Sequence, residues 1–179
     1  MNAGVATDKR GAPMKINDDH LYHGGALTQI AEDPQFTAIN AVRSAGTISQ
    51  SAFRINDSIG VYLKYASEPK PPAKDYIFTF TKANKDELAK IATQSGKLFI
   101  ALVCIDGRHI CCLEYTELNT WLKRRYDALR KKEDTSTILV NLPKGKEFRV
   151  NMNQPGRRKT YLANPQLVPR NRFPNALFE

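Results

Sequence analysis

The sequence has no apolar run as long as a membrane-spanning helix, and its first ten residues contain no apolar stretch typical of a secretion signal. These two absences predict a cytoplasmic protein with no membrane partner. Cysteine is scarce: Cys104, Cys111 and Cys112 are the three in the chain. An odd number of closely spaced cysteines does not form a disulfide framework, and adjacent residues of a strand face opposite sides. We therefore expect buried, reduced thiols rather than a zinc site.

Sequence signals of several enzyme classes are missing as well. The chain contains neither a glycine-rich phosphate loop nor a Gly-x-Gly-x-x-Gly segment. Its three histidines, at positions 20, 23 and 109, form no Ser-His-Asp pattern. The cysteines lie in the most apolar stretch of the chain, where a reactive thiolate is disfavoured. The common motifs of nucleotide-dependent enzymes, serine hydrolases and cysteine hydrolases are therefore absent from the sequence.

Positive charge, in contrast, is in excess. The net charge is +9, with 27 Lys and Arg against 18 Asp and Glu. Residues 1–122 hold 13 side chains of each sign, whereas residues 123–179 hold 14 basic and 5 acidic ones. A concentrated basic region is typical of a protein that meets a polyanion. The alternative is a basic surface that serves only to keep the protein in solution.

The length of 179 residues and the 41% hydrophobic content suit one α/β domain with a small appendage. Residues 1–18 are polar, without periodicity, and are predicted to form a flexible arm. Residues 19–133 carry the apolar patterns of an α/β core domain. Residues 134–179 are predicted to form a basic C-terminal β extension and a tail that packs on the core.

Within the core, the apolar pattern predicts a central mixed β-sheet flanked by helices. Helical spacing indicates helices over residues 25–43 and 84–95, and a third that begins at Thr116. A turn at residues 56–58 between two apolar runs predicts a β-hairpin over residues 51–66. Further strands are expected at 76–81, 98–105 and 109–113. The residues expected to be largely buried are Leu63, Ile77, Phe78, Leu98, Ile100, Leu102, Ile110 and Trp121.

One charged residue interrupts the second strand of that hairpin. Lys64 lies in an otherwise apolar run, so its ammonium group must either extend to solvent or meet an acid. Asp57, at the start of the same strand, is the nearest acidic candidate in the sequence. A structural salt bridge between Asp57 and Lys64 is the simplest interpretation of this pair.

The predicted order over residues 24–105, helix-strand-strand-strand-helix-strand, resembles the restriction-endonuclease-like nuclease core, the PD-(D/E)XK superfamily. That resemblance implies two acids that hold a divalent cation, Mg²⁺ or Mn²⁺, and a lysine that positions the attacking water. Asp57 would be the first acid and a metal ligand, and Lys64 the lysine. Tyr62 stands where the second acid belongs, and a neutral phenol is a poor ligand for a hard cation. Glu32 or Asp75 could supply the missing carboxylate, so the site is expected to be degenerate, with weak catalysis or none.

Two short segments, residues 23–30 and 61–65, also resemble a group of small uncharacterised bacterial proteins. This second resemblance implies no function.

The basic region contains clusters of cations beside tyrosines, a combination that suits phosphate contacts with some base stacking. The candidate nucleic-acid-binding residues are Lys123, Arg124, Arg125, Arg130, Arg157, Arg158 and Lys159. The sequence thus favours a protein that binds DNA or RNA on a nuclease-like core. The alternative is a non-catalytic interaction protein, such as an inhibitor or accessory factor, whose basic surface meets an acidic protein partner.

Overall fold

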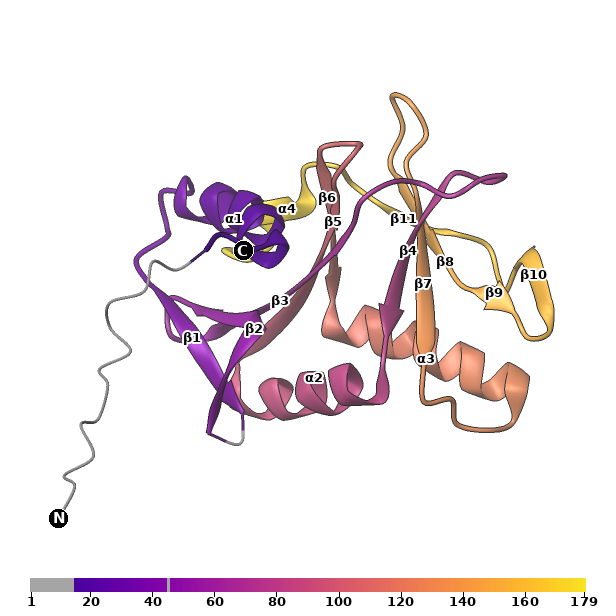
Figure 1. The fold of residues 1–179 in the computed structure, drawn as a ribbon, viewed down its shortest axis with the longest axis horizontal. Helices are drawn as coiled ribbons and strands as arrows, with labels where there is room; N and C mark the ends of the chain where they lie inside the picture. Colours follow the sequence, from indigo (N-terminus) through magenta and orange to yellow (C-terminus); the bar gives the residue numbers. More distant parts are fainter. Residues whose placement is uncertain (1–14, 45) are drawn as a thin grey trace, which may run out of the picture.

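A computed structural model describes residues 15–44 and 46–179, and within them it shows an α/β fold with a mixed central sheet (Figure 1). Most of the predicted arm, residues 1–14, lies outside the described residues. In the part of the chain that is described, no helix is long and apolar enough to cross a membrane. The predicted α/β class with a mixed central sheet is confirmed.

The first sheet has five strands in the order β1-β2-β3-β5-β6. These strands are β1 (Ile39–Ser44), β2 (Thr47–Ile55), β3 (Ile59–Ala66), β5 (Lys97–Cys104) and β6 (His109–Glu114). The central pair, β3 and β5, runs parallel, and the other neighbours run antiparallel. Since a parallel pair requires a crossover, the chain leaves the sheet after β3 and returns to it through a helix before β5.

The second sheet has four antiparallel strands in the order β11-β8-β7-β4. They are β4 (Asp75–Phe80), β7 (Ser136–Asn141), β8 (Phe148–Asn151) and β11 (Gln166–Val168). A two-stranded hairpin of β9 (Asn153–Gln154) and β10 (Arg157–Tyr161) extends beside it (Figure 1). Because β4 pairs with β7, strands from both sides of the boundary predicted at residue 133 share one sheet.

Four helices are described: α1 (Asp18–Ala31), α2 (Lys82–Gln94), α3 (Tyr115–Leu129) and the short α4 (Arg172–Asn175). Thr81 caps α2, and its side chain accepts a hydrogen bond from the backbone of Asn84. The prediction of a helix over residues 25–43 is wrong, because α1 ends at Ala31 and residues 39–44 form β1. Proline at position 34 follows directly and cannot continue the hydrogen-bond ladder of a helix.

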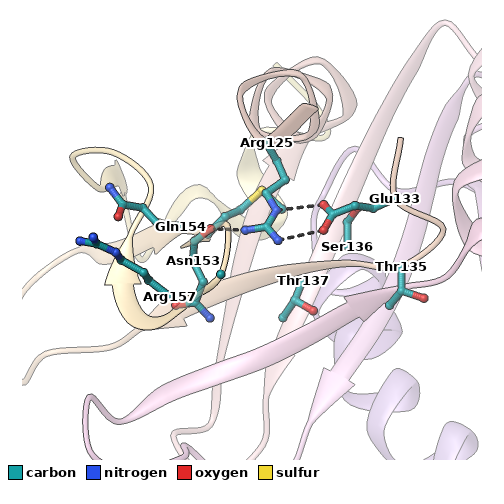
Figure 2. A pocket seen from close by; sticks show the side chains of 10 residues that line it. Arg125, Glu133, Thr135, Ser136, Thr137, Asn153, Gln154 and Arg157 are labelled. Atoms are coloured by element: carbon teal, nitrogen blue, oxygen red, sulfur yellow. Dashed lines mark hydrogen bonds and ion pairs between the residues drawn. The ribbon is translucent and has the colours of Figure 1, made fainter. Parts of the chain in front are cut away.

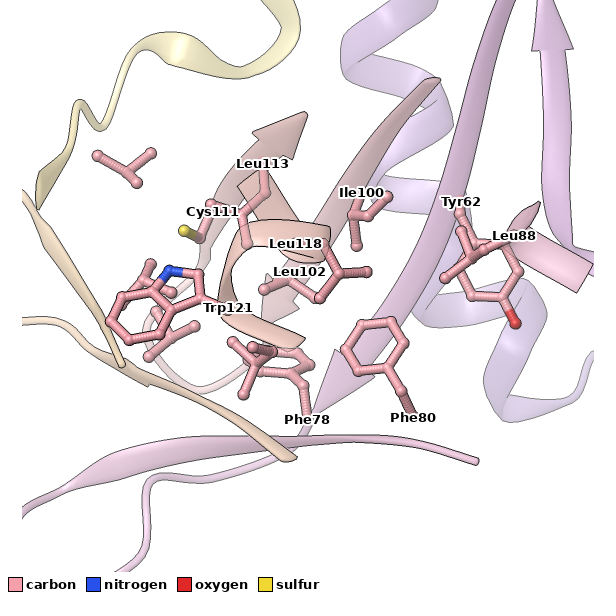
Figure 3. Packing of buried hydrophobic residues seen from close by; sticks show 14 of the residues in the cluster. Tyr62, Phe78, Phe80, Leu88, Ile100, Leu102, Cys111, Leu113, Leu118 and Trp121 are labelled. Carbon is pink, nitrogen blue, oxygen red and sulfur yellow. The ribbon is translucent and has the colours of Figure 1, made fainter. Parts of the chain in front are cut away.

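The apolar residues form two layers, one on each face of the first sheet. The layer under α1 and α4 contains Ala26, Ile30, Leu63, Phe99, Cys112, Phe173 and Leu177. The larger layer lies between the two sheets, where α2 and α3 also pack, and Trp121 and Phe78 are prominent in it (Figure 3). Cys111 and Cys112 belong to opposite layers, and all three cysteines are free and buried, as predicted.

One predicted core residue is not in the core. Ile77 is 43% exposed, whereas Tyr76, Phe78 and Phe80 are buried. Side chains alternate along a strand, so Ile77 and Phe78 cannot both face the same layer. The outer face of the second sheet, on which Ile77 lies, is open to solvent at this point. The other seven residues predicted to be buried are buried.

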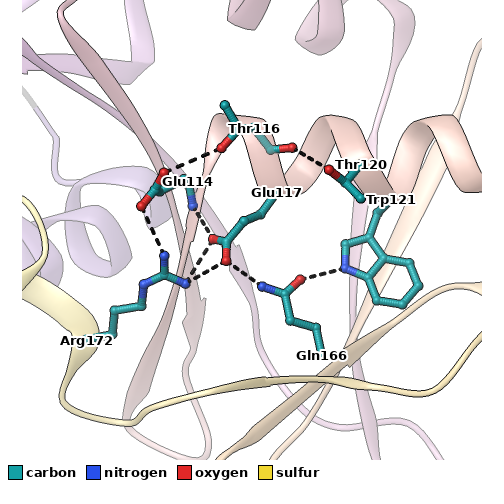
Figure 4. A network of polar contacts seen from close by, with 7 residues as sticks. All are labelled: Glu114, Thr116, Glu117, Thr120, Trp121, Gln166 and Arg172. Atoms are coloured by element: carbon teal, nitrogen blue, oxygen red, sulfur yellow. Dashed lines mark hydrogen bonds and ion pairs between the residues drawn. The ribbon is translucent and has the colours of Figure 1, made fainter.

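A polar network fastens the C-terminal segment to the start of α3 (Figure 4). Arg172 donates to Glu117 at 2.9 Å and to Glu114 at 3.4 Å. The Gln166 side chain donates to Glu117 at 2.7 Å and accepts from the Trp121 indole N–H at 2.9 Å. Since these contacts satisfy both ends of the Gln166 amide, they set the position of β11 against α3.

Candidate nucleic-acid interface

The structure does not bring the four predicted catalytic residues together. Glu32 is exposed at the end of α1, and Asp57 is exposed in the turn before β3, where it accepts from the Asn40 side chain at 3.3 Å. Lys64 lies near the far end of β3, roughly 20 Å further along a strand that rises about 3.3 Å per residue. Asp75 begins β4 in the other sheet. The predicted convergence of Asp57 and Lys64 is therefore wrong, as is the salt bridge between them.

These acids also do not form a metal site. Among residues 15–44 and 46–179 there is no group of three or more His, Cys, Asp or Glu side chains that could hold a metal ion. A divalent cation prefers several oxygen ligands at short range, whereas the side-chain contact that the described residues make to the Asp57 carboxylate comes from an amide nitrogen, that of Asn40. The residues present thus do not fit the cation that the superfamily resemblance implied.

Lys64 instead has a polar environment built by α2. Its ammonium group donates to the Asn84 side chain at 3.2 Å and lies 5.2 Å from the centre of the Phe80 ring. Within the described residues no carboxylate is in ion-pair distance of it, and burial lowers the pKa of Lys64. On the same face of β3, the Tyr62 hydroxyl donates to Glu87 at 3.1 Å. Burial, followed by the charge of Glu87, raises the pKa of Tyr62, so the phenol stays protonated.

Sequence reasoning missed Asn84 and Glu87 as neighbours of Lys64. Both lie in the helix predicted over residues 84–95, and their distance from β3 in the sequence gave no signal of contact. The pattern that could have found them is the spacing of three residues, which places the two side chains on one face of a helix.

The predicted basic residues of α3 differ in how many contacts their charged groups already make within the protein. Arg125 is fully engaged: its guanidinium donates to both carboxylate oxygens of Glu133, at 2.9 and 2.8 Å, and to the Asn153 carbonyl at 2.6 Å (Figure 2). Lys123 pairs with Asp127 at 2.7 Å on the exposed helix surface. Arg124 stacks over the Trp121 ring, with 4.9 Å between the guanidinium carbon and the ring centre. Arg125 is therefore a structural residue rather than a free phosphate contact.

The Arg125–Glu133 pair forms one wall of a hollow of about 330 Å³. Ser136 and Thr137 of β7 and Thr135 just before it supply hydroxyls, and Gln154 and Arg157 come from the β9–β10 hairpin. The Arg157 side chain extends from the hairpin, away from the ion pair (Figure 2). This hollow thus offers hydroxyl donors and one guanidinium whose charge is not matched by a described carboxylate.

A second hollow, of about 470 Å³, adjoins the first, since Glu133 and Ser136 line both. Five lysines and three acids line it: Lys82, Lys85, Lys123, Lys131 and Lys132, with Asp86, Glu133 and Asp134. Lys82 and Lys123 form ion pairs and Lys85 donates to the Glu133 carbonyl, so Lys131 and Lys132 are the two lysines of the hollow without an ion pair or hydrogen bond to a described residue. Tyr126, which is 47% exposed, lies among them. Lysines 82 and 85 belong to α2, so the sequence did not associate them with the basic residues of α3. Together these two adjoining hollows form the basic surface of the protein.

The remaining predicted basic residues lie at exposed turns. Arg130 caps the C-terminus of α3 with a left-handed backbone, and Lys159 has a φ of +73° in β10. Both side chains are exposed. The side chain of Arg158 lies outside the part of the chain that is described. The structure therefore places Arg124, Arg130, Arg157 and Lys159 at positions a ligand can reach.

Comparison of this chain with protein-family models, with curated proteins and with solved structures finds no match.

Proposed function

We propose that this protein binds nucleic acid through the basic surface, on a restriction-endonuclease-like core with little or no catalytic activity. The observation that carries the proposal is the gathering of Lys131, Lys132 and Arg157, none of which forms an ion pair with a described residue, around two adjoining hollows. Phosphate contacts of this kind supply most of the affinity of non-specific nucleic-acid binding. Exposed Tyr126 adds a ring on which a base can stack.

The order of elements around the first sheet supports the nuclease-like part of the proposal. When β4, which joins the second sheet, is set aside, the chain runs α1, β1, β2, β3, α2, β5. This is the helix-strand-strand-strand-helix-strand order of the superfamily core. Because Asp57, Lys64 and Asp75 are far apart, we expect cleavage by this protein to be very slow or absent even with Mg²⁺ or Mn²⁺.

Salt dependence of binding tests the proposal. Binding to random-sequence duplex DNA and to single-stranded DNA and RNA is measured by fluorescence anisotropy between low and moderate salt. Replacing Lys131 and Arg157 by alanine removes one cation from each hollow. If both contact phosphates, the log–log salt slope on duplex DNA falls in magnitude by about 1.8.

A matched control separates contact from net charge. Lys144 and Lys146 are exposed in the loop between β7 and β8, at the other end of the second sheet from the end of α3 (Figure 1). Replacing both by alanine changes the charge equally, and we expect an unchanged slope. Equal effects of the two double variants would contradict a defined basic surface. No binding by wild type at low salt would overturn the proposal and favour an acidic protein partner.

A further inference from the structure

The outer face of the second sheet contains a cavity that the proposed function does not use. Its volume is about 390 Å³, and the residues that line it include Asp75, Leu139, Asn141, Arg149 and Tyr161. It lies on the sheet face opposite the inter-sheet layer, since Asp75 and Ile77 have the same parity along β4. The β9–β10 hairpin borders both this cavity and the first hollow of the basic surface, through Tyr161 and Arg157 respectively.

Strand register aligns three polar side chains across this face. Asp75 pairs with Asn141 on β7, and Asn141 pairs with Arg149 on β8. Directly paired residues of neighbouring strands share a face, and strands lie about 4.8 Å apart. An acid, an amide and a guanidinium thus lie in one row, with roughly 10 Å between the outer two backbones.

Asp75 is the deepest member of the row, with 7% of its surface exposed. Its Oδ2 accepts from the Tyr161 hydroxyl at 2.8 Å. Among the described residues no cation lies in ion-pair distance of this carboxylate, and no hydrogen bond to Oδ1 is formed. Burial, followed by the hydrogen bond to Asp75, raises the pKa of Tyr161 to about 12, so the phenol remains a donor at neutral pH. One carboxylate oxygen therefore remains available to a ligand that carries N–H donors.

Arg149 provides the complementary chemistry at the other end of the row. Its side chain is exposed and makes no hydrogen bond to any described residue, so its guanidinium donors are available. A ligand that fits must offer N–H donors to Asp75 at one edge and hydrogen-bond acceptors to Arg149 at the opposite edge.

We propose that this cavity binds a guanine base of the nucleic acid held by the basic surface, an inference that rests on the proposed function. Guanine presents N1–H and N2–H donors to the Asp75 carboxylate, where Oδ1 is free and Oδ2 has a second lone pair beside the one that Tyr161 uses. Its O6 and N7 acceptors are of the kind that arginine recognises. Adenine presents an unprotonated N1 in the place of N1–H, so it would set an acceptor against a carboxylate. The volume is within the range of small-molecule pockets and exceeds that of one base.

Single-stranded oligothymidylates with one central guanine, hypoxanthine or adenine test this assignment. We expect wild type to bind the guanine strand about tenfold more tightly than the adenine strand, the size of one bidentate base contact. Hypoxanthine, which keeps N1–H and lacks the N2 amine, should fall between them. Equal affinities for the three strands overturn the inference.

Variants locate the preference. Asp75→Asn keeps the side-chain size and an acceptor for Tyr161, and it should abolish the preference for guanine. Arg149→Gln, at an exposed position, should also reduce it, and remains informative if the Asp75 variant does not fold. Thr79→Ala is the control, since Thr79 is exposed on the same strand face outside the cavity. A guanine preference that survives both cavity substitutions overturns the site.

These experiments distinguish a failure of the guanine site from a failure of the proposed nucleic-acid binding. Salt-dependent binding that needs Lys131 and Arg157 but shows no base preference leaves the proposed function intact and overturns only the guanine site. Free guanosine monophosphate that binds as tightly as the oligonucleotide, and equally well in the Lys131→Ala Arg157→Ala variant, would show that the cavity holds a free nucleotide and not a base of a strand.

Discussion

The ion pair between Arg125 and Glu133 should be the strongest of the pairs near the basic surface. Its two side chains are 18% and 23% exposed, and both carboxylate oxygens receive a hydrogen bond. A third donor of the same guanidinium binds the Asn153 carbonyl. The pair Lys123–Asp127 on the same helix is the natural comparison, since its side chains are 75% and 55% exposed and share one contact.

The expected magnitudes follow from exposure and geometry. Hydrogen bonds to charged groups contribute about 1.5–3 kcal/mol each when they are partly buried, and removal of one partner leaves the other charge uncompensated. We expect a coupling free energy of about 2–3 kcal/mol between Arg125 and Glu133. For Lys123 and Asp127, an exposed pair four residues apart on a helix, we expect about 0.3–0.5 kcal/mol.

Double-mutant cycles with alanine measure both couplings from the free energy of unfolding in urea. Raising the salt concentration should reduce the Lys123–Asp127 coupling and change the Arg125–Glu133 coupling little, because partly buried pairs are screened less. Equal couplings in the two cycles would refute the reasoning. The same result would return Arg125 to the set of residues free to bind phosphate.

Two further predictions concern buried titratable groups. Burial raises the pKa of Cys104 and of Cys112 to about 12 and raises that of Cys111 as well. A thiol reagent at pH 8 should therefore find no reactive thiol in the native protein and three after denaturation. Rapid reaction of the native protein would contradict the burial of these thiols. Burial lowers the pKa of His23, whose ring meets the Gln50 carbonyl at 3.1 Å, so the unfolded chain takes up a proton near pH 6.5 before the folded protein does. The contribution of neutral His23 to the free energy of unfolding should be complete above that pH and decline below it. A His23→Gln variant should show a flatter pH profile of the urea midpoint. An unchanged profile would exclude His23 as the cause.

Sequence patterns identified the strongly apolar elements and failed where burial is slight. Strand β5 could be recognised because both of its faces are covered, so nearly every residue is apolar. Strand β1 could not be recognised, because it lies at the edge of the sheet and its side chains are mostly exposed. Among the described residues of β1, Val42 is the buried hydrophobic one. The spacing of three residues between Ile39 and Val42 fits a helix better than a strand, in which the two side chains face opposite sides.

The candidate sites were harder to predict than the fold because they depend on contacts distant in sequence. Lys64 was singled out correctly as a residue that needs a polar partner, but its partner, Asn84, comes from the next helix rather than from the same strand. The basic surface was predicted only in its C-terminal part, since Lys82 and Lys85 join it through the packing of α2 beside α3. Asp75 was noted as an acid, and Asn141 and Arg149 fall in the β extension that the sequence predicted. The pairing of β4 with β7, which brings Asp75 into their row, was not indicated.

The position of Phe173 and Leu177 has a consequence for folding during synthesis. Both side chains complete the apolar layer over α1 and the first sheet, although α1 leaves the ribosome more than a hundred residues earlier. That layer therefore stays open over β6, which α4 contacts, and leaves Ile110 and Cys112 uncovered until the segment after residue 172 has emerged from the exit tunnel. During that interval the nascent chain exposes a sheet face of the kind that chaperones recognise, and stable folding must follow translation of this segment rather than accompany the growth of the first sheet.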